Sequence, residues 1–288
     1  MVSKSIAKGQ HKEKKAKGLL TGPKRALALG RTAVSLLFSA YGATDREGFA
    51  ALNRQTRHYL AMSTVMHTGC MRFRLMQEVH RRGMIRWSQP DNTYLVRADW
   101  RKMKQMTGEY TVKFPAIPKF RAMLYDIYDA NGNVTGSFTA ASILKWQIGM
   151  TRSRKGRYVF EPDRGKELSA RRFKEWLRAS FRTLLTGNKD EIEVLAKAIT
   201  PHSFRAGLAS DLERSDVPRP TIKKLGRWSS SRAMEQYMRD GLAQKIYKLQ
   251  FWHIRHEHGE VTRRTAKPAV AEEPTDGSEG YDDDSMDC

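Results

Sequence analysis

The sequence has little of what stabilises secreted or membrane-embedded proteins. Its 288 residues include only two cysteines, Cys70 and Cys288, which excludes a disulfide framework and indicates a reducing, intracellular compartment. The longest apolar run, residues 33–43, is too short to span a bilayer. The sequence also lacks a hydrophobic secretory leader and any Cys/His cluster with metal-site spacing. We therefore predict no cofactor, no metal, no membrane partner and no small-molecule substrate.

Acidic residues are also scarce. Lys and Arg number 52 against 31 Asp and Glu, a formal net charge of +21. The basic residues 1–31 and the acidic residues 268–288 cancel each other, so the excess belongs to the body of the chain. A basic folded body favours a polyanionic partner, of which nucleic acid is the usual one, although a ribosome or an anionic membrane surface fits the same charge.

Composition divides the chain into three parts. Residues 1–45 are expected to be a basic, flexible leader with room for one short helix, serving as a nuclear-import run or a solvated arm. Residues 46–258 are the expected folded domain, and the 40% hydrophobic content of the chain supports a core. Residues 259–288, rich in Pro, Gly, Ser and acids, are expected to form a disordered acidic tail.

The first half of the body changes its periodicity. Helical composition covers residues 47–66 and 67–87, and a turn is predicted from residue 86 to residue 91. Strand-like segments then predict one hairpin within 93–115, and an Asn-Gly signal predicts a second within 125–138. With helices after these hairpins, the predicted fold class is α+β, mostly helical with a small β-hairpin or sheet on one side.

Capping residues mark the helices of the second half. Ser169 and Thr200 are each expected to cap a helix. Thr221 is expected to cap a short helix that ends at Gly226, and Ser229–Ser231 to cap the last one.

Four residues in this half carry possible chemistry. His202 and Arg205 lie three residues apart on a predicted helix, and Trp228 and Tyr237 follow. Each has a simpler explanation when taken alone: His-x-x-Arg pairs are common, and the two aromatics suit a helix packed on a core. Their order and spacing, with Leu-Gly ahead of the tryptophan, favour a functional explanation.

Residues 200–239 carry a family resemblance, with the sequence TPHSFRAGLASDLERSDVPRPTIKKLGRWSSSRAMEQYMR. This segment resembles the C-terminal signature of the tyrosine recombinases, the phage-integrase-like enzymes that exchange DNA strands. Residues 158–178 and the first predicted hairpin also resemble that family, so the resemblance covers roughly residues 60–245. The Gly-Arg-Trp form looks most like recombinases of eukaryotic mobile elements, such as the DIRS and Crypton types.

The resemblance implies roles for the four residues. Tyr237 would be the nucleophile that forms a 3′-phosphotyrosyl bond with DNA, and Arg205 the second arginine on the phosphate. His202 would hydrogen-bond the phosphate or assist proton transfer. Trp228 stands where many relatives have histidine, and its indole can only donate. This chemistry needs no metal, because arginine forks can stabilise the charge on the non-bridging oxygens.

Two further roles are less sharply placed by the resemblance. The first catalytic arginine is assigned to Arg72, with Arg74 as the alternative. Relatives have an acid three residues after this arginine, and Leu75 stands at that position here, which leaves the choice open. The lysine that protonates the leaving 5′-oxygen is assigned to Lys104, with Lys102 next.

The resemblance also implies partners. The expected substrate is double-stranded DNA, bound by a tetramer in the nucleus, with residues 241–258 passed to a neighbouring copy or packed on their own domain. The family's helical core-binding domain has no counterpart in the sequence, so a fragment of a larger mobile-element protein, or weak clamping of DNA, is expected. Two alternatives stay open: an inactive DNA-binding protein derived from a recombinase, and an enzyme like type IB topoisomerases.

Overall fold

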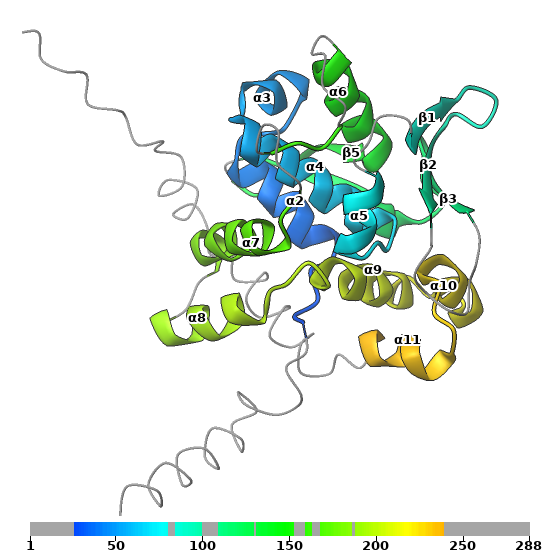
Figure 1. Ribbon diagram of the computed structural model, residues 1–288. Helices are drawn as coiled ribbons and strands as arrows, with labels where there is room; N and C mark the ends of the chain where they lie inside the picture. Colours follow the sequence, from blue (N-terminus) through cyan, green and yellow to red (C-terminus); the bar gives the residue numbers. More distant parts are fainter. Residues whose placement is uncertain are drawn as a thin grey trace, which may run out of the picture.

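The computed structural model describes residues 26–79, 84–99, 109–129, 131–152, 159–162, 168–185 and 188–238. These residues form a mostly helical α+β structure with two small antiparallel sheets, as the sequence predicts (Figure 1). The helices are α2 (Arg31–Ala40), α3 (Arg46–Ala51), α4 (Arg54–Thr68), α5 (Phe73–Val79), the 3-10 helix η2 (Arg121–Met123), α6 (Ala140–Arg152), α7 (Ala170–Leu184), α8 (Lys189–Ala198), α9 (Ser203–Arg214), α10 (Arg219–Gly226) and α11 (Ser231–Met238). The strands are β1 (Ile85–Ser88), β2 (Thr93–Asp99), β3 (Glu109–Pro115), β4 (Leu124–Tyr128) and β5 (Val134–Thr139). Among the described helices, none combines the length and the hydrophobicity of a membrane-spanning segment.

Helix α2, which the sequence placed in the leader, is part of the core. Its buried apolar side chains follow helical spacing: Ala33, Val34, Leu37 and Phe38. Just before it, the Leu29 amide donates to the Ser203 carbonyl (2.9 Å) at the start of α9. The predicted leader boundary at residue 45 is therefore wrong for residues 26–45, because the basic composition of the first residues hid an apolar helix that packs on distant elements.

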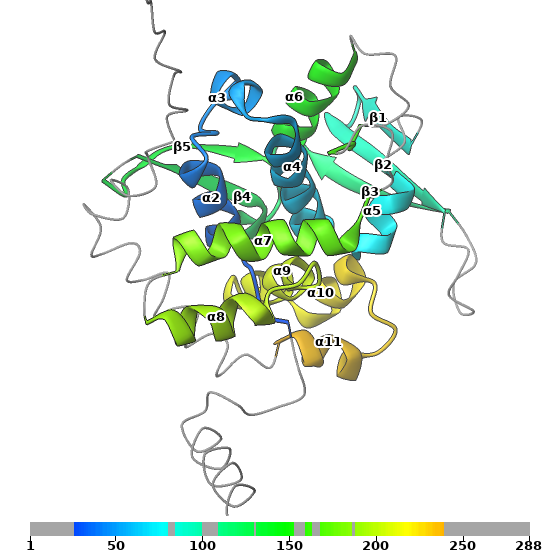
Figure 2. The same ribbon diagram turned by 60° about the vertical axis from the view of Figure 1, so that its left-hand side comes forward.

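Two helices replace the single helix predicted over residues 47–66. Asn53 leaves the helical conformation between α3 and α4, and its side chain caps α4 by accepting the Thr56 amide (2.9 Å). Helix α4 is buried along nearly its whole length from Thr56 onward. It packs against α2, α6 and α9, so it forms the centre of the helical layer (Figures 1 and 2).

The helix predicted over residues 67–87 is also interrupted. Cys70 adopts the left-handed conformation (φ 49°) after α4, and α5 begins only at Phe73. Residues Ile85–Ser88 form β1, where the sequence predicted a turn to begin, because they pair with β2. At this left-handed turn, Cys70 packs in a buried cluster with side chains of α9, α10 and α11.

Both predicted hairpins are confirmed. In the first, β2 and β3 pair from Thr93 with Pro115 to Asp99 with Glu109, and β1 adds a third strand. In the second, β4 and β5 pair antiparallel across the Asn-Gly turn. One face of the three-stranded sheet carries buried side chains, namely Ile85, Val96, Val112 and Phe114. Helices α5 and α6 pack on this sheet.

The predicted caps of the C-terminal helices are partly right. The hydroxyls of Ser169 and Ser230 each accept the amide three residues on, at 3.3 Å and 3.1 Å, as predicted for α7 and α11. The other two caps were misplaced: α9 begins at Ser203 rather than directly after Thr200, and Thr221 lies inside α10.

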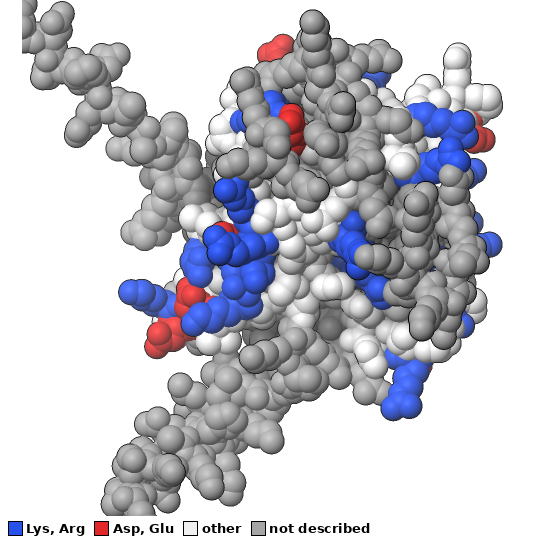
Figure 3. Space-filling view, in the orientation of Figure 1, with Lys and Arg blue, Asp and Glu red and all other residues white. Residues whose placement is uncertain are grey.

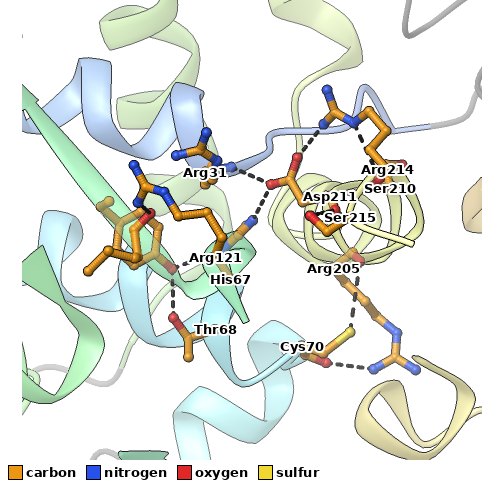
Figure 4. Close-up of polar contacts among 12 residues, drawn as sticks. Arg31, His67, Thr68, Cys70, Arg121, Arg205, Ser210, Asp211, Arg214 and Ser215 are labelled. Carbon is orange, nitrogen blue, oxygen red and sulfur yellow. Dashed lines mark hydrogen bonds and ion pairs between the residues drawn. The ribbon is translucent and has the colours of Figure 1, made fainter. Parts of the chain in front are cut away.

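A buried polar network ties α9 to the N-terminal segment and to α4 (Figure 4). The Asp211 carboxylate accepts the backbone amide of Arg31 (2.5 Å) and the guanidinium of Arg214. His67 on α4 lies between Asp211 (3.2 Å) and the hydroxyl of Tyr125 (2.9 Å). Burial raises the pKa of Tyr125, so its hydroxyl keeps its proton and can donate. These bonds hold α9 against α4 and β4.

Replacing Gly207 with alanine is expected to destabilise the fold by about 3 kcal/mol. A Cβ at Gly207 on α9 would lie 1.9 Å from the Leu29 carbonyl oxygen, which is backbone and cannot rotate away. Urea denaturation measures the loss. Gly149→Ala is the matched control, because Gly149 on α6 meets nothing within 4 Å and gains about 1 kcal/mol of helix propensity. Equal behaviour of the two variants would contradict the close packing of α9 on residue 29.

Candidate active site

The centre of the site is Arg205, in the first turn of α9. Its side chain is buried, and its guanidinium donates to two backbone carbonyls. Nη1 donates to the Cys70 carbonyl at 2.6 Å, and Nη2 donates to the Gly226 carbonyl. Arg205 therefore connects the turn after α4 with the end of α10, and these two bonds leave other N–H donors of its five for a ligand.

Two aromatic rings lie beside this guanidinium. Cζ of Arg205 is 4.5 Å from the ring centroid of Trp228 and 5.6 Å from that of Tyr237. The two rings are 5.4 Å apart and tilted by 49°. Trp228 is buried and Tyr237 is half-buried, so the tyrosine on α11 is held next to a positive charge without being sealed from solvent.

The backbone after α10 explains how Trp228 reaches this place. A Cβ at Gly226 would lie 1.7 Å from the Trp228 ring, so glycine is required for the ring to fold back on the helix end. Arg227 follows in the left-handed conformation (φ 53°), which reverses the direction of the chain between Gly226 and Trp228. The Gly-Arg-Trp sequence thus forms one compact turn.

Arg72 and His202 lie close to Arg205. Arg72 is half-buried between the Cys70 turn and α5, and His202 immediately precedes α9. Partial burial lowers the pKa of His202, and the positive charges of Arg72 and Arg205 lower that pKa further. His202 is consequently neutral near pH 7, with an exposed side chain that a ligand can reach.

Three N–H donors of this cluster are buried without an acceptor among the described residues. They are the Nε groups of Arg72 and Arg205 and the indole Nε1 of Trp228. Most buried donors in proteins have an acceptor, and a buried donor without one raises the energy of the folded state. An anion with several oxygens would satisfy such donors, so the cluster suits an oxyanion such as a phosphodiester.

The structure thus brings together Tyr237, Arg205, His202, Trp228 and Arg72. Three other candidates differ. Arg74 has an exposed side chain on α5, and it is Arg72 whose charge acts on His202. The lysine candidates, at positions 102 and 104, lie outside the described residues.

Sequence reasoning missed Arg227, whose Nη1 lies 3.4 Å from the Gly69 carbonyl. Its place between Gly226 and Trp228 was the only signal available. Cys70, expected to be a packing residue, is buried, and this burial raises the pKa of its thiol. Within the described part of the chain, no group of three His, Cys, Asp or Glu side chains could hold a metal ion.

One region of the chain is similar in sequence to a known family. Residues 131–243 match the sequence profile of the phage integrase family. This region includes His202, Arg205, Trp228 and Tyr237. The resemblance noted in the sequence is therefore confirmed for this region. No curated protein matches the chain in sequence.

Solved structures with a similar arrangement are distant in sequence. The XerH site-specific recombinase bound to palindromic difH substrate is 12% identical, with a TM-score of 0.46 over 79% of this chain and 55% of that chain. XerA recombinase is 10% identical, with a TM-score of 0.48 over 79% of this chain and 66% of that one. The Tn1549 transposon integrase in complex with transposon right end DNA is 13% identical, with a TM-score of 0.43 over 80% and 67%. The chain thus spans little more than half the length of the XerH chain.

Proposed function

We propose that this chain is the catalytic domain of a tyrosine recombinase that cuts and rejoins double-stranded DNA through a 3′-phosphotyrosyl intermediate. The observation that carries the proposal is the stack of Arg205 on Trp228 and Tyr237, with buried N–H donors that lack acceptors. The match of residues 131–243 to the phage integrase family supports it.

In the proposed reaction the Tyr237 hydroxyl oxygen attacks a DNA phosphorus. The bond from phosphorus to the 5′-oxygen breaks as the bond to tyrosine forms, so the number of phosphate ester bonds is unchanged. Arg205, whose Cζ lies 5.6 Å from the centroid of the Tyr237 ring, would hold the phosphate next to the attacking oxygen. A 5′-hydroxyl from another strand can then attack the phosphotyrosine and release the enzyme.

The remaining residues act on the phosphate. Arg72 and Arg205 would stabilise the negative charge that develops on the non-bridging oxygens, and the Trp228 indole would donate to one of them. Neutral His202 would accept the proton of Tyr237. We assign protonation of the leaving 5′-oxygen to Lys104, outside the described residues, with Lys102 as the alternative.

The surface charge supports DNA as the partner. Lys and Arg side chains gather over α7 and again over α5, on the face shown in Figure 3. The basic residues of α7 are Arg171, Arg172, Lys174, Arg178 and Arg182. Positive side chains of this kind bind the phosphate backbone regardless of base sequence, so binding should weaken steeply with salt.

We also propose a type of recombinase, a location and an assembly for this chain. The Gly226-Arg227-Trp228 turn favours a recombinase of the DIRS or Crypton type, and hence a mobile element acting in the nucleus. Assembly as a tetramer on DNA, with residues 241–258 as the exchanged segment, follows from the same resemblance, and that segment lies outside the described residues.

A second function is favoured by one observation. Leu75 on α5 stands where the resembling family has an acid, and its side chain is buried in the hydrophobic core. A carboxylate near Arg72 is thus replaced by a packing residue, which favours a DNA-binding protein that has lost its activity. Such a protein would bind DNA with strong salt dependence and form no covalent product.

Covalent trapping tests the proposal. The chain is incubated with nicked suicide duplexes from a random-site pool, and a denaturant-resistant adduct is isolated and digested to find the linked peptide. The expected peptide contains Tyr237, and sequencing of the trapped DNA gives the site. Salt-sensitive binding without any adduct would favour the inactive DNA-binding protein, and relaxation of supercoiled plasmid without site preference would favour a type IB topoisomerase-like enzyme.

The rate of adduct formation is expected to fall when the pH drops below 6.5, the ordinary pKa of histidine. Since the pKa of His202 is lowered in the folded protein, the midpoint of the fall should lie below 6.5. The unfolded chain binds this proton first as the pH falls, so stability declines over the same range. Single-turnover rates between about pH 5 and pH 8 measure the effect.

His202→Gln is the control for this pH dependence. It should lower the rate by about 10²-fold and remove the acid limb, because glutamine does not titrate. An unchanged acid limb in His202→Gln would assign that titration to another group.

A further inference from the structure

Arg227 occupies a backbone conformation that disfavours a side chain. It follows the last residue of α10 with φ 53° and ψ 47°, in the left-handed region where glycine is the usual residue at helix ends. A Cβ in this region carries a steric penalty, which asparagine and aspartate tolerate better than arginine. Non-glycine residues at strained backbone positions often mark functional sites. An arginine therefore stands where glycine would be less strained.

Its guanidinium reaches the same turn as Arg205 does. Nη1 of Arg227 donates to the Gly69 carbonyl (3.4 Å), and Nη1 of Arg205 donates to the next carbonyl, that of Cys70 (2.6 Å). The positive charges of Arg205, Arg227 and Arg72 all act to lower the pKa of the Cys70 thiol against the larger effect of burial. Three guanidinium groups thus surround a single turn.

Such a cluster is unfavourable until an anion binds. Like charges at close range repel each other, and the repulsion is relieved when a phosphate enters. The bond from Arg227 to the Gly69 carbonyl is long, at 3.4 Å. A structural role alone does not explain an arginine here, because a glycine would remove both the repulsion and the backbone strain.

We propose that Arg227 is a third phosphate-binding arginine of this site, in contact with the phosphodiester that Arg72 and Arg205 hold. This inference rests on the proposed function. Arg227 would add positive charge next to Trp228, on the side of the phosphate that faces the end of α10.

Two substitutions test this role. Arg227→Gly removes the charge and the backbone strain together, and Arg227→Lys keeps the charge and the strain. We expect Arg227→Gly to melt at the wild-type temperature or above it, and to form adduct about 10²-fold more slowly at saturating DNA. The slope of log affinity against log salt should fall by about one. Arg227→Lys should recover the salt slope and part of the rate.

Arg219→Ala is the matched control, because Arg219 is an exposed arginine on α10 that pairs with Glu213. It should keep the adduct rate of the wild type. A wild-type rate and salt slope in Arg227→Gly would overturn the proposal. A slower rate with an unchanged salt slope would also overturn it, since that pattern indicates an arginine that only positions the turn ahead of Arg72.

The test separates this inference from the proposed function. If the wild-type chain forms no adduct, strand cleavage fails as the function, while the salt slope of DNA binding still decides whether Arg227 contacts phosphate. If Arg227→Gly does not fold, Arg227→Asn carries the same comparison, because asparagine tolerates the left-handed conformation.

Discussion

Replacing Tyr237 with phenylalanine is expected to lower the rate of covalent adduct formation by at least about 10⁴-fold. The DNA affinity and the melting temperature should stay near those of the wild type. The substitution removes one oxygen and keeps the ring that packs 5.4 Å from Trp228. The side chain is only half-buried, so loss of the hydroxyl should leave no buried hydrogen-bonding group without a partner. Adduct yield on nicked duplexes, thermal melting and DNA affinity are measured on the same preparation.

Tyr94→Phe is the matched control for this variant. Tyr94 is a half-buried tyrosine on β2 that packs edge-on against Trp87, with ring centroids 4.7 Å apart. Removing its hydroxyl should leave the adduct yield unchanged. An adduct that persists in Tyr237→Phe would show that another residue is the nucleophile.

Replacing Arg205 with alanine is expected to lower both activity and stability. Loss of the guanidinium should slow adduct formation by about 10³-fold, because the charge on the phosphate oxygens loses its partner. Two carbonyls, those of Cys70 and Gly226, would lose a donor in a buried site. The free energy of unfolding should fall by about 3 kcal/mol. Single-turnover kinetics and urea denaturation separate the two effects.

Arg178→Ala distinguishes a catalytic arginine from a structural one. Like Arg205, Arg178 donates to two backbone carbonyls, those of Lys197 (2.5 Å) and Ile199 (3.2 Å). It lies on α7, so its loss should cost about 1 kcal/mol of stability and weaken DNA binding. At saturating DNA the cleavage rate of the folded protein should be unchanged. If Arg205→Ala behaves like Arg178→Ala, with a normal rate where it is folded, Arg205 only holds the two turns together.

Arg205→Lys refines the same comparison. Lysine keeps the positive charge, but it cannot donate to both carbonyls and a phosphate in one fixed plane. The rate should therefore stay about 10²-fold below that of the wild type, and part of the stability should return. A full recovery of the rate by lysine would show that charge alone is sufficient at this position.

The sequence by itself determined the local features of this protein. The caps at Ser169 and Ser230 depend on one side chain and an amide three residues on. The first hairpin follows from strand propensity, and the second from strand propensity and an Asn-Gly turn signal. The resemblance also named His202, Arg205, Trp228 and Tyr237, which the fold brings together.

Only the tertiary structure decided the features that depend on distant contacts. Helix α2 joins the core because α4 and β4 cover its apolar face, which the basic composition around it concealed. Arg72 is brought to the site by the left-handed turn at Cys70, and Arg227 by a left-handed turn of its own. Both turns are held by arginine bonds between segments more than 130 residues apart in the sequence, at Gly69–Cys70. No local pattern encodes such contacts, because their energy depends on burial and charge that exist only after folding.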